Sequence, residues 1–99
     1  MEHPLEITQA TYLHDYVLQI KFNTNEEVEL DLLPMIEQDA LGIYEPLKKV
    51  DFFRQFHVDY TLCWDKDIDV APEYIYFLAH KNDPQFQALF REWGYIKEA

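Results

Sequence analysis

Three residues with reactive side chains, His57, Asp59 and Cys63, lie close together in the sequence. A histidine beside a cysteine can take the thiol proton and leave a nucleophilic thiolate, while a third polar group orients the histidine. Such a site also needs donors that stabilise an oxyanion. The chain has only two glycines, and neither Gly42 nor Gly94 lies beside Cys63. Because a lone cysteine on a short strand is usually a small buried apolar residue, we predict no catalysis here.

The stretch DKDID places Asp65, Asp67 and Asp69 at alternate positions, as in a calcium loop of the D-x-D-x-D type. That loop requires glycine at its sixth position and a bidentate glutamate at its twelfth. This chain has Val70 and Tyr76 there, which excludes an EF-hand. The pattern favours a solvated acidic loop.

The four histidines, at positions 3, 14, 57 and 80, lack the i, i+4 spacing or the shared strand face of zinc ligands. Glycine-rich phosphate loops, H-E-x-x-H and C-x-x-C are also absent from the sequence. We therefore predict that the protein has no metal site and no cofactor.

The charge of the chain restricts its partners. Nineteen acidic and eight basic residues give a formal net charge of −11. Such a chain repels nucleic acid and anionic membranes unless its cations gather on one face, and only Lys48, Lys49 and Arg54 lie close together. The charge disfavours direct binding to nucleic acid and allows a basic protein partner.

The sequence also indicates a compartment. Cys63 is the only cysteine, so no intramolecular disulfide forms, which fits a reducing environment. No apolar run approaches the length of about 20 residues that spans a membrane. The first residues, MEHPLEIT, lack a basic and apolar signal segment. These features predict a cytoplasmic protein without membrane association.

Two segments, DLLPMI and DVAPEYIY, place an aspartate three residues before a proline that opens an apolar stretch. Proline suits the first helical turn, and a carboxylate near a helix start can accept hydrogen bonds from free amides. We interpret Asp31 with Pro34, and Asp69 with Pro72 and Glu73, as structural helix starts and assign no chemistry to them.

Alternating apolar residues predict the strands of an α+β domain. The clearest case is residues 16–22, which form a hairpin with residues 28–32 across the turn NTNE. The sheet is expected to contain about five antiparallel strands, at residues 5–13, 16–22, 28–32, 56–60 and 62–64. Gly42 is expected to end the first helix.

A last helix is predicted after the Asp83-Pro84 cap, with Gly94 near its end. Its apolar stripe packs either on the chain's own core or on another subunit, and the small size of the domain favours the first answer. The candidate interaction surface comprises Tyr76, Phe86, Phe90 and Trp93. The predicted organisation is one α+β domain over residues 1–80 and a helical extension over residues 81–99.

The order of several short motifs resembles a family of small prokaryotic proteins catalogued as domain of unknown function 2442 (DUF2442). The motifs are LHDYVLQIKF, ELDLLP, IYEPL, FHVD, a strand that ends in Trp64, and DVAPEYIY. The resemblance covers about residues 4–78 and implies an antiparallel sheet with helices after the Asp-x-x-Pro sites. It implies no activity. Because some members are encoded beside another small protein, it also implies a toxin–antitoxin-like pair.

Two functions from different classes follow. The leading hypothesis is a non-catalytic interaction module that binds another protein or pairs with itself, for example as one half of a toxin–antitoxin-like or regulatory pair. The second hypothesis is a small enzyme, or a domain that binds a ligand or a metal. It would use the acidic residues 65–69, or the group of His57, Asp59 and Cys63.

Overall fold

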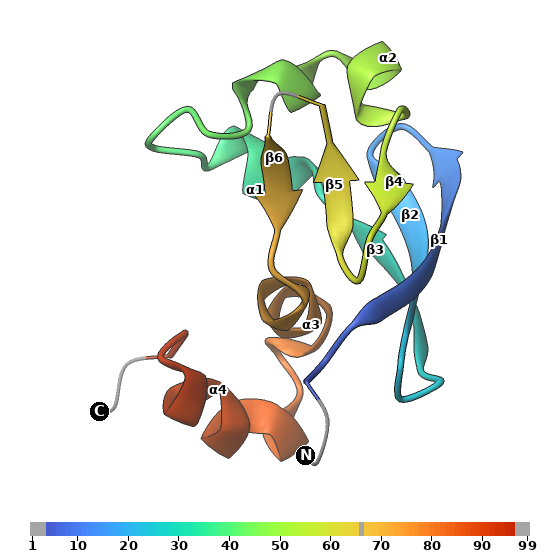
Figure 1. The fold of residues 1–99 in the computed structure, drawn as a ribbon. Coiled ribbons are helices and arrows are strands. Elements are labelled where there is room, and N and C mark those ends of the chain that lie inside the picture. The colour runs from blue at the N-terminus through green and yellow to red at the C-terminus, as the bar shows by residue number, and fades with distance from the viewer. Residues whose placement is uncertain (1–3, 66, 97–99) are drawn as a thin grey trace.

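Six antiparallel strands and four α-helices form the fold in a computed structural model that describes residues 4–65 and 67–96 (Figure 1). The strands belong to two sheets of three, in the orders β1-β2-β3 and β4-β5-β6. The prediction of an α+β fold with antiparallel strands is therefore confirmed. The expected single sheet of about five strands is wrong.

The first sheet consists of β1 (Ile7–His14), β2 (Val17–Phe22) and β3 (Glu27–Asp31). Its turns place Asp15 and Asn25 at positive φ, a conformation that the short side chains of Asp and Asn tolerate. The alternation along β2 buries every second side chain and gives the sheet an inner face, as the sequence predicts.

The second sheet consists of β4 (His57–Val58), β5 (Leu62–Trp64) and β6 (Ile68–Val70). It joins the first sheet where the Ile7 amide donates to the Tyr60 carbonyl at 2.9 Å, and Figure 1 shows β4 beside β1. Tyr60 has a positive φ of 49°, which ends β4 before the expected residue 60.

The sixth strand, β6, lies within the stretch expected to be an acidic loop. Ile68 and Val70 are buried while Asp69 between them is exposed, which is the alternation of a half-buried strand. The apolar–polar alternation of a strand of three residues is too short to be recognised in a sequence segment where aspartates precede and interrupt it.

A group of helices follows each sheet in the sequence. They are α1 (Leu33–Glu37), the 3-10 turn η1 (Glu45–Lys48), α2 (Val50–Phe53), α3 (Pro72–His80), the 3-10 turn η2 (Pro84–Phe86) and α4 (Gln87–Trp93).

Gly42 does not end α1, contrary to the expectation. The helix ends at Glu37, and Gly42 has a φ of 72° in the loop that follows. That loop closes on itself, since an Asp39 carboxylate oxygen accepts from the Tyr44 amide at 2.6 Å and the Asp39 carbonyl accepts from the Gly42 amide at 3.2 Å. The positive φ therefore serves a surface turn.

The core lies between the two sheets and α3. The fully buried side chains come from both sheets and from several helices: Ile7, Leu18, Ile20, Phe22, Leu32, Ile36, Leu47, Phe53, Leu62, Val70, Ile75 and Phe90. Trp64 is also buried, and its indole N–H donates to the Phe53 carbonyl at 2.8 Å. The open face of the second sheet is thus backed by a tightly packed layer.

The last helix, α4, packs on its own chain. Phe90 is fully buried, and its ring lies 5.1 Å from that of Phe77 and 6.5 Å from that of Tyr76 on α3. Gly94 ends the helix in the left-handed conformation, and the Tyr95 amide donates to the Phe90 carbonyl. Residues 97–99 of the predicted extension lie outside the described residues.

Within residues 4–65 and 67–96, no helix is both long and apolar enough to cross a membrane.

Candidate functional site

The outer face of the second sheet carries a row of three polar side chains. His57 on β4 is the direct partner of Cys63 on β5, and Cys63 is in turn the partner of Asp69 on β6. Directly opposed residues of antiparallel strands point to the same face, with Cβ atoms about 5 Å apart. The fold therefore brings together residues from both groups that the sequence singled out.

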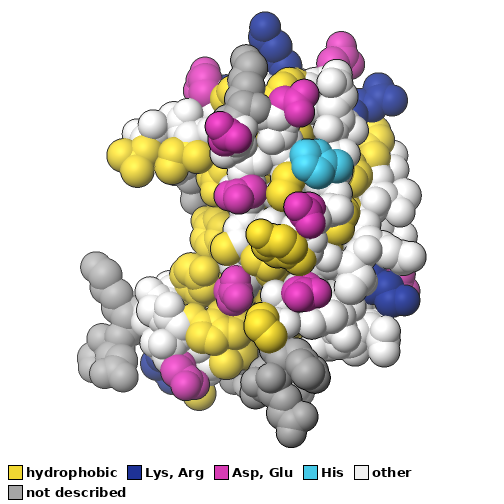
Figure 2. Space-filling view, viewed as in Figure 1, with side chains coloured by type: hydrophobic (Ala, Val, Ile, Leu, Met, Phe, Trp, Pro, Cys, Tyr) yellow, Lys and Arg dark blue, Asp and Glu magenta, His cyan; other side chains and the backbone are white. Residues whose placement is uncertain are grey.

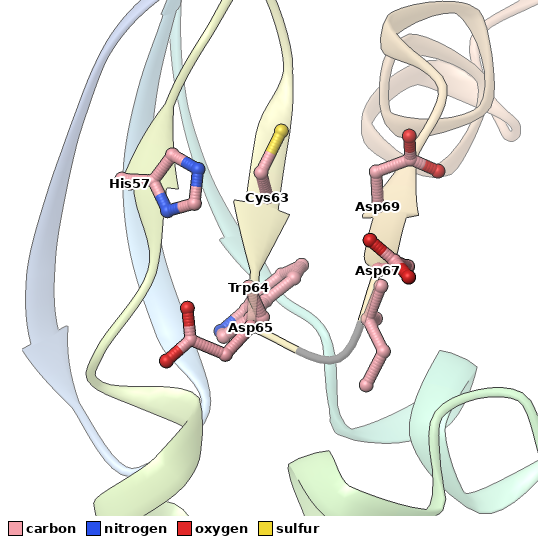
Figure 3. A pocket seen from close by; sticks show the side chains of 7 residues that line it. His57, Cys63, Trp64, Asp65, Asp67 and Asp69 are labelled. Carbon is pink, nitrogen blue, oxygen red and sulfur yellow. The ribbon is translucent and has the colours of Figure 1, made fainter.

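These three side chains line a hollow of about 390 Å³. Asp65 and Asp67, on the loop between β5 and β6, complete its rim (Figure 3). In that view Asp65 lies on the His57 side, while Asp67 and Asp69 lie on the opposite side. The carboxylates thus spread around the rim and do not converge on one point.

The electrostatics of this hollow oppose nucleophilic catalysis. Partial burial raises the pKa of the Cys63 thiol, and the negative charges of Asp69 and Asp59 raise this pKa further. The thiol also donates to the Thr61 carbonyl at 3.7 Å. Since a reactive cysteine needs a lowered pKa, Cys63 stays in the protonated, unreactive form near neutral pH.

The described residues also offer no metal centre, because no three of their His, Cys, Asp or Glu side chains are arranged to hold an ion. Asp59 does not line the hollow. It lies in the turn after β4, where its amide donates to the Thr61 carbonyl at 3.0 Å.

The first Asp-x-x-Pro segment lies at the start of α1. An Asp31 carboxylate oxygen accepts from the Leu33 amide at 3.0 Å, and Pro34 occupies the first turn of the helix. This carboxylate is engaged by local backbone.

The second segment is arranged differently. Pro72 is the first residue of α3 and Glu73 lies in its first turn, but the N-cap residue is Ala71, which provides no side-chain cap. Asp69 belongs to β6, and its side chain lies at the hollow beside Cys63. The two aspartates therefore occupy different environments, although their sequence contexts match.

Two of the four residues of the candidate interaction surface are inside the molecule. Phe90 is fully buried and Tyr76 is 8% exposed. Phe86 and Trp93 are half-buried, with rings 5.5 and 6.2 Å from that of Tyr76. The stripe on α4 therefore contributes mainly to the core, and this burial leaves little of it for a partner.

Exposed apolar side chains occur elsewhere, in loops outside the candidate interaction surface. Leu41 is 84% exposed, Ile43 is 52% exposed and Tyr60 is 64% exposed. Leu41 and Ile43 flank Gly42 without a helical or strand period, and Ile43 also begins the motif IYEPL. Exposed apolar side chains that form a contiguous patch are typical of interaction surfaces.

The face of the molecule that carries the second sheet is acidic. Figure 2 shows Asp and Glu side chains spread among apolar ones across the front of the second sheet, with Lys and Arg toward the edges of the view. Ion pairs of the described residues are His14 with Asp15, Lys48 with Glu45, and His80 with Glu26. The carboxylates around the hollow thus have no cationic partner among the residues that the structure describes.

Comparison with known proteins identifies a family. A family model described as "Protein of unknown function (DUF2442)" matches residues 7–81, which is most of the chain. No curated protein and no solved structure matches the chain significantly.

Proposed function

Because the chain belongs to the DUF2442 family, whose description names no function, we propose from its own surface that it is a non-catalytic protein-interaction module. In this role it would bind a second protein in the cytoplasm, as one half of a regulatory or toxin–antitoxin-like pair. The observation that carries the proposal is the face on which apolar and acidic side chains are interspersed (Figure 2), where the carboxylates around the hollow have no cationic partner among the described residues.

An exposed apolar side chain is costly to keep in water. Fully burying a leucine or isoleucine side chain is worth about 1.5–3 kcal/mol, so Leu41 and Ile43 offer a partner considerable binding free energy. Tyr60 adds an exposed aromatic ring, a residue type that recurs at the centres of interfaces. The surrounding carboxylates would speed and orient association with a basic partner.

The test combines capture with reconstitution. Tagged wild-type chain and the double variant Leu41→Ser/Ile43→Ser would be used to capture partners from native cells, and each captured protein would then be purified and bound in isolation. Light scattering of the pure chain measures self-association. We expect one partner, or a second copy, to bind the wild type at least about tenfold more tightly than the double variant.

A matched control keeps this test specific. Leu13→Ser changes a partly exposed leucine on β1, and it should leave partner affinity unchanged. A chain that is strictly monomeric and retains no purified partner would refute the proposal.

The competing function uses the hollow on the second sheet, where the strand register aligns His57, Cys63 and Asp69. Because the pKa of the thiol is raised, this alignment favours a domain that binds a ligand over a small enzyme. A metal would have to bind without three donor side chains arranged around it among the described residues. Calcium chloride and zinc chloride, titrated separately, would reveal it through the amide NMR shifts of residues 57–70. Saturable shifts at micromolar metal would support this function, whereas the interaction proposal expects none.

A further inference from the structure

Another concave region lies beside the edge of β6 that faces away from β5. It is visible in Figure 2 as the indentation between the loop at residues 38–44 and the end of α4. Tyr44 comes from that loop, Tyr74 from α3 and Tyr95 from the turn after α4. The Tyr74 and Tyr95 rings are 5.6 Å apart. Burial raises the pKa of Tyr44, and the nearby Tyr74 raises it further.

Carboxylates border this tyrosine cluster. The Asp39 carboxylate accepts from the Tyr44 amide at 2.6 Å, Asp69 lies on the edge strand β6, and Glu73 directly precedes Tyr74 in the first turn of α3. In keeping with these positions, Asp39 and Asp69 raise the pKa of Tyr44, and Glu73 raises that of Tyr95. None of them forms an ion pair with a cation of the described residues. A tyrosine face attracts cations through its quadrupole, and nearby carboxylates strengthen this attraction.

The adjoining strand edge is also available. In its sheet β6 pairs with β5 only, so its other edge has no strand partner among the described residues. An extended segment can add to such an edge through main-chain hydrogen bonds. The exposed side chains of Leu41 and Ile43 lie on the loop that borders the same indentation. The tyrosine rings, the strand edge and the exposed side chains of Leu41 and Ile43 together form a larger surface than a small cation could cover.

We propose that this tyrosine-lined region receives an extended basic segment of a partner protein, with a Lys or Arg side chain lying against Tyr74 and Tyr95 between Asp69 and Glu73. The inference rests on the proposed interaction function and names its surface and the chemistry of its partner. Charge complementarity selects the occupant. A second copy of this chain would carry the same net charge of −11 and be repelled.

The test is an NMR titration with a short blocked peptide of alternating arginine and valine, beside the same peptide with glutamate in place of arginine. We expect the arginine peptide to shift amides at residues 39–44, 68–74 and 95. Tyr95→Ala should weaken its affinity about fivefold, and Tyr95→Phe, which retains the ring, should restore most of it.

Matched charge variants distinguish a docking site from general attraction. Asp69→Asn and Glu29→Gln each remove one negative charge, but Glu29 lies on β3 outside the tyrosine cluster. We expect Asp69→Asn to weaken binding of the arginine peptide by more than about threefold, and Glu29→Gln to weaken it by less. Equal losses, shifts spread over the whole acidic surface, or no binding of the arginine peptide would overturn the inference.

Binding measurements with the partner identified for the wild-type chain distinguish failure of this inference from failure of the proposed interaction function. If that partner binds Asp69→Asn and Tyr95→Ala as tightly as wild type, the proposed docking region is wrong while the interaction function stands. If no partner exists, the interaction function itself fails.

Discussion

Asp69 is the residue whose environment departs most from its sequence context. It shares the Asp-x-x-Pro pattern with Asp31, yet it lies on a strand directly opposite Cys63, and its charge raises the pKa of both the Cys63 thiol and Tyr44. The difference arises because residue 69 belongs to a strand paired with β5, a contact that local sequence does not encode.

Asp69→Asn should make Cys63 more reactive. Removing the negative charge lowers the pKa of the thiol, so a larger fraction is thiolate at a given pH. The rate of alkylation by iodoacetamide, followed by mass spectrometry across the alkaline range, should reach its midpoint at lower pH in the variant. Glu29→Gln serves as the control and should leave the midpoint unchanged. Identical profiles for Asp69→Asn and wild type would contradict the electrostatic explanation.

Tyr76 gives the molecule a pH-dependent stability. Burial, together with a hydrogen bond to the Glu26 carboxylate, raises the pKa of Tyr76 from 10.0 to about 12. Because the folded-state pKa is the higher one, the folded state keeps its proton where the unfolded state has lost it. The free energy of unfolding is therefore unaffected below about pH 10 and falls as the pH rises through about 12.

The loss attributable to this tyrosine is up to about 2–3 kcal/mol. Urea unfolding of Tyr76→Phe, which has no ionisable hydroxyl, should show a correspondingly smaller decline over that range. Tyr60→Phe changes an exposed tyrosine and should follow wild type. Parallel curves for Tyr76→Phe and wild type would show that the phenol does not control this decline.

At the scale of elements, α4 acts as part of the core, although it lies beyond the family match. Phe90→Ala should reduce the free energy of unfolding by about 3–5 kcal/mol, since it empties a fully buried ring position between α3 and α4. Leu41→Ala, at an exposed position, should change it by less than about 0.5 kcal/mol. Chemical denaturation measures both. A small loss for Phe90→Ala would mean that residues 81–99 are a detachable extension.

The elements that sequence predicted well are those with a long repeat. The hairpin of β2 and β3 has three large buried side chains at period two on β2 and turn-forming residues between the strands. The starts of α1 and α3 were readable from their prolines. In contrast, β4 and β6 have two and three residues, which is too few for a periodic signal.

For the same reason, only part of the candidate sites could be predicted from the sequence. His57, Cys63 and Asp69 could be selected as reactive types, but their alignment depends on the pairing of β5 with both neighbours. The tyrosine cluster joins residues 44, 74 and 95 from three separate segments. Only the tertiary fold determines such a combination.

At the scale of the whole molecule, the net charge of −11 should act in opposite directions on stability and on binding. Salt screens repulsion within the folded chain, so the melting temperature should rise between about 0.01 M and 0.5 M NaCl. Binding to a basic partner should weaken over the same range. The double variant Glu27→Gln/Glu29→Gln should show a smaller rise in melting temperature. A melting temperature that falls with salt would contradict this account.

The hydrogen bond from the Ile7 amide to the Tyr60 carbonyl joins two residues that are far apart in the sequence. This separation has a consequence while the chain is being synthesised. The strands of the first sheet leave the ribosome well before residue 60. Leu18, Ile20 and Phe22, which are buried in the folded chain, therefore stay uncovered until later elements have been made. In that interval the nascent chain presents an uncovered apolar sheet face, a form prone to aggregation. Newly made chains are therefore at greatest risk before α3 emerges, since its Tyr76 ring lies 5.1 Å from that of Phe22.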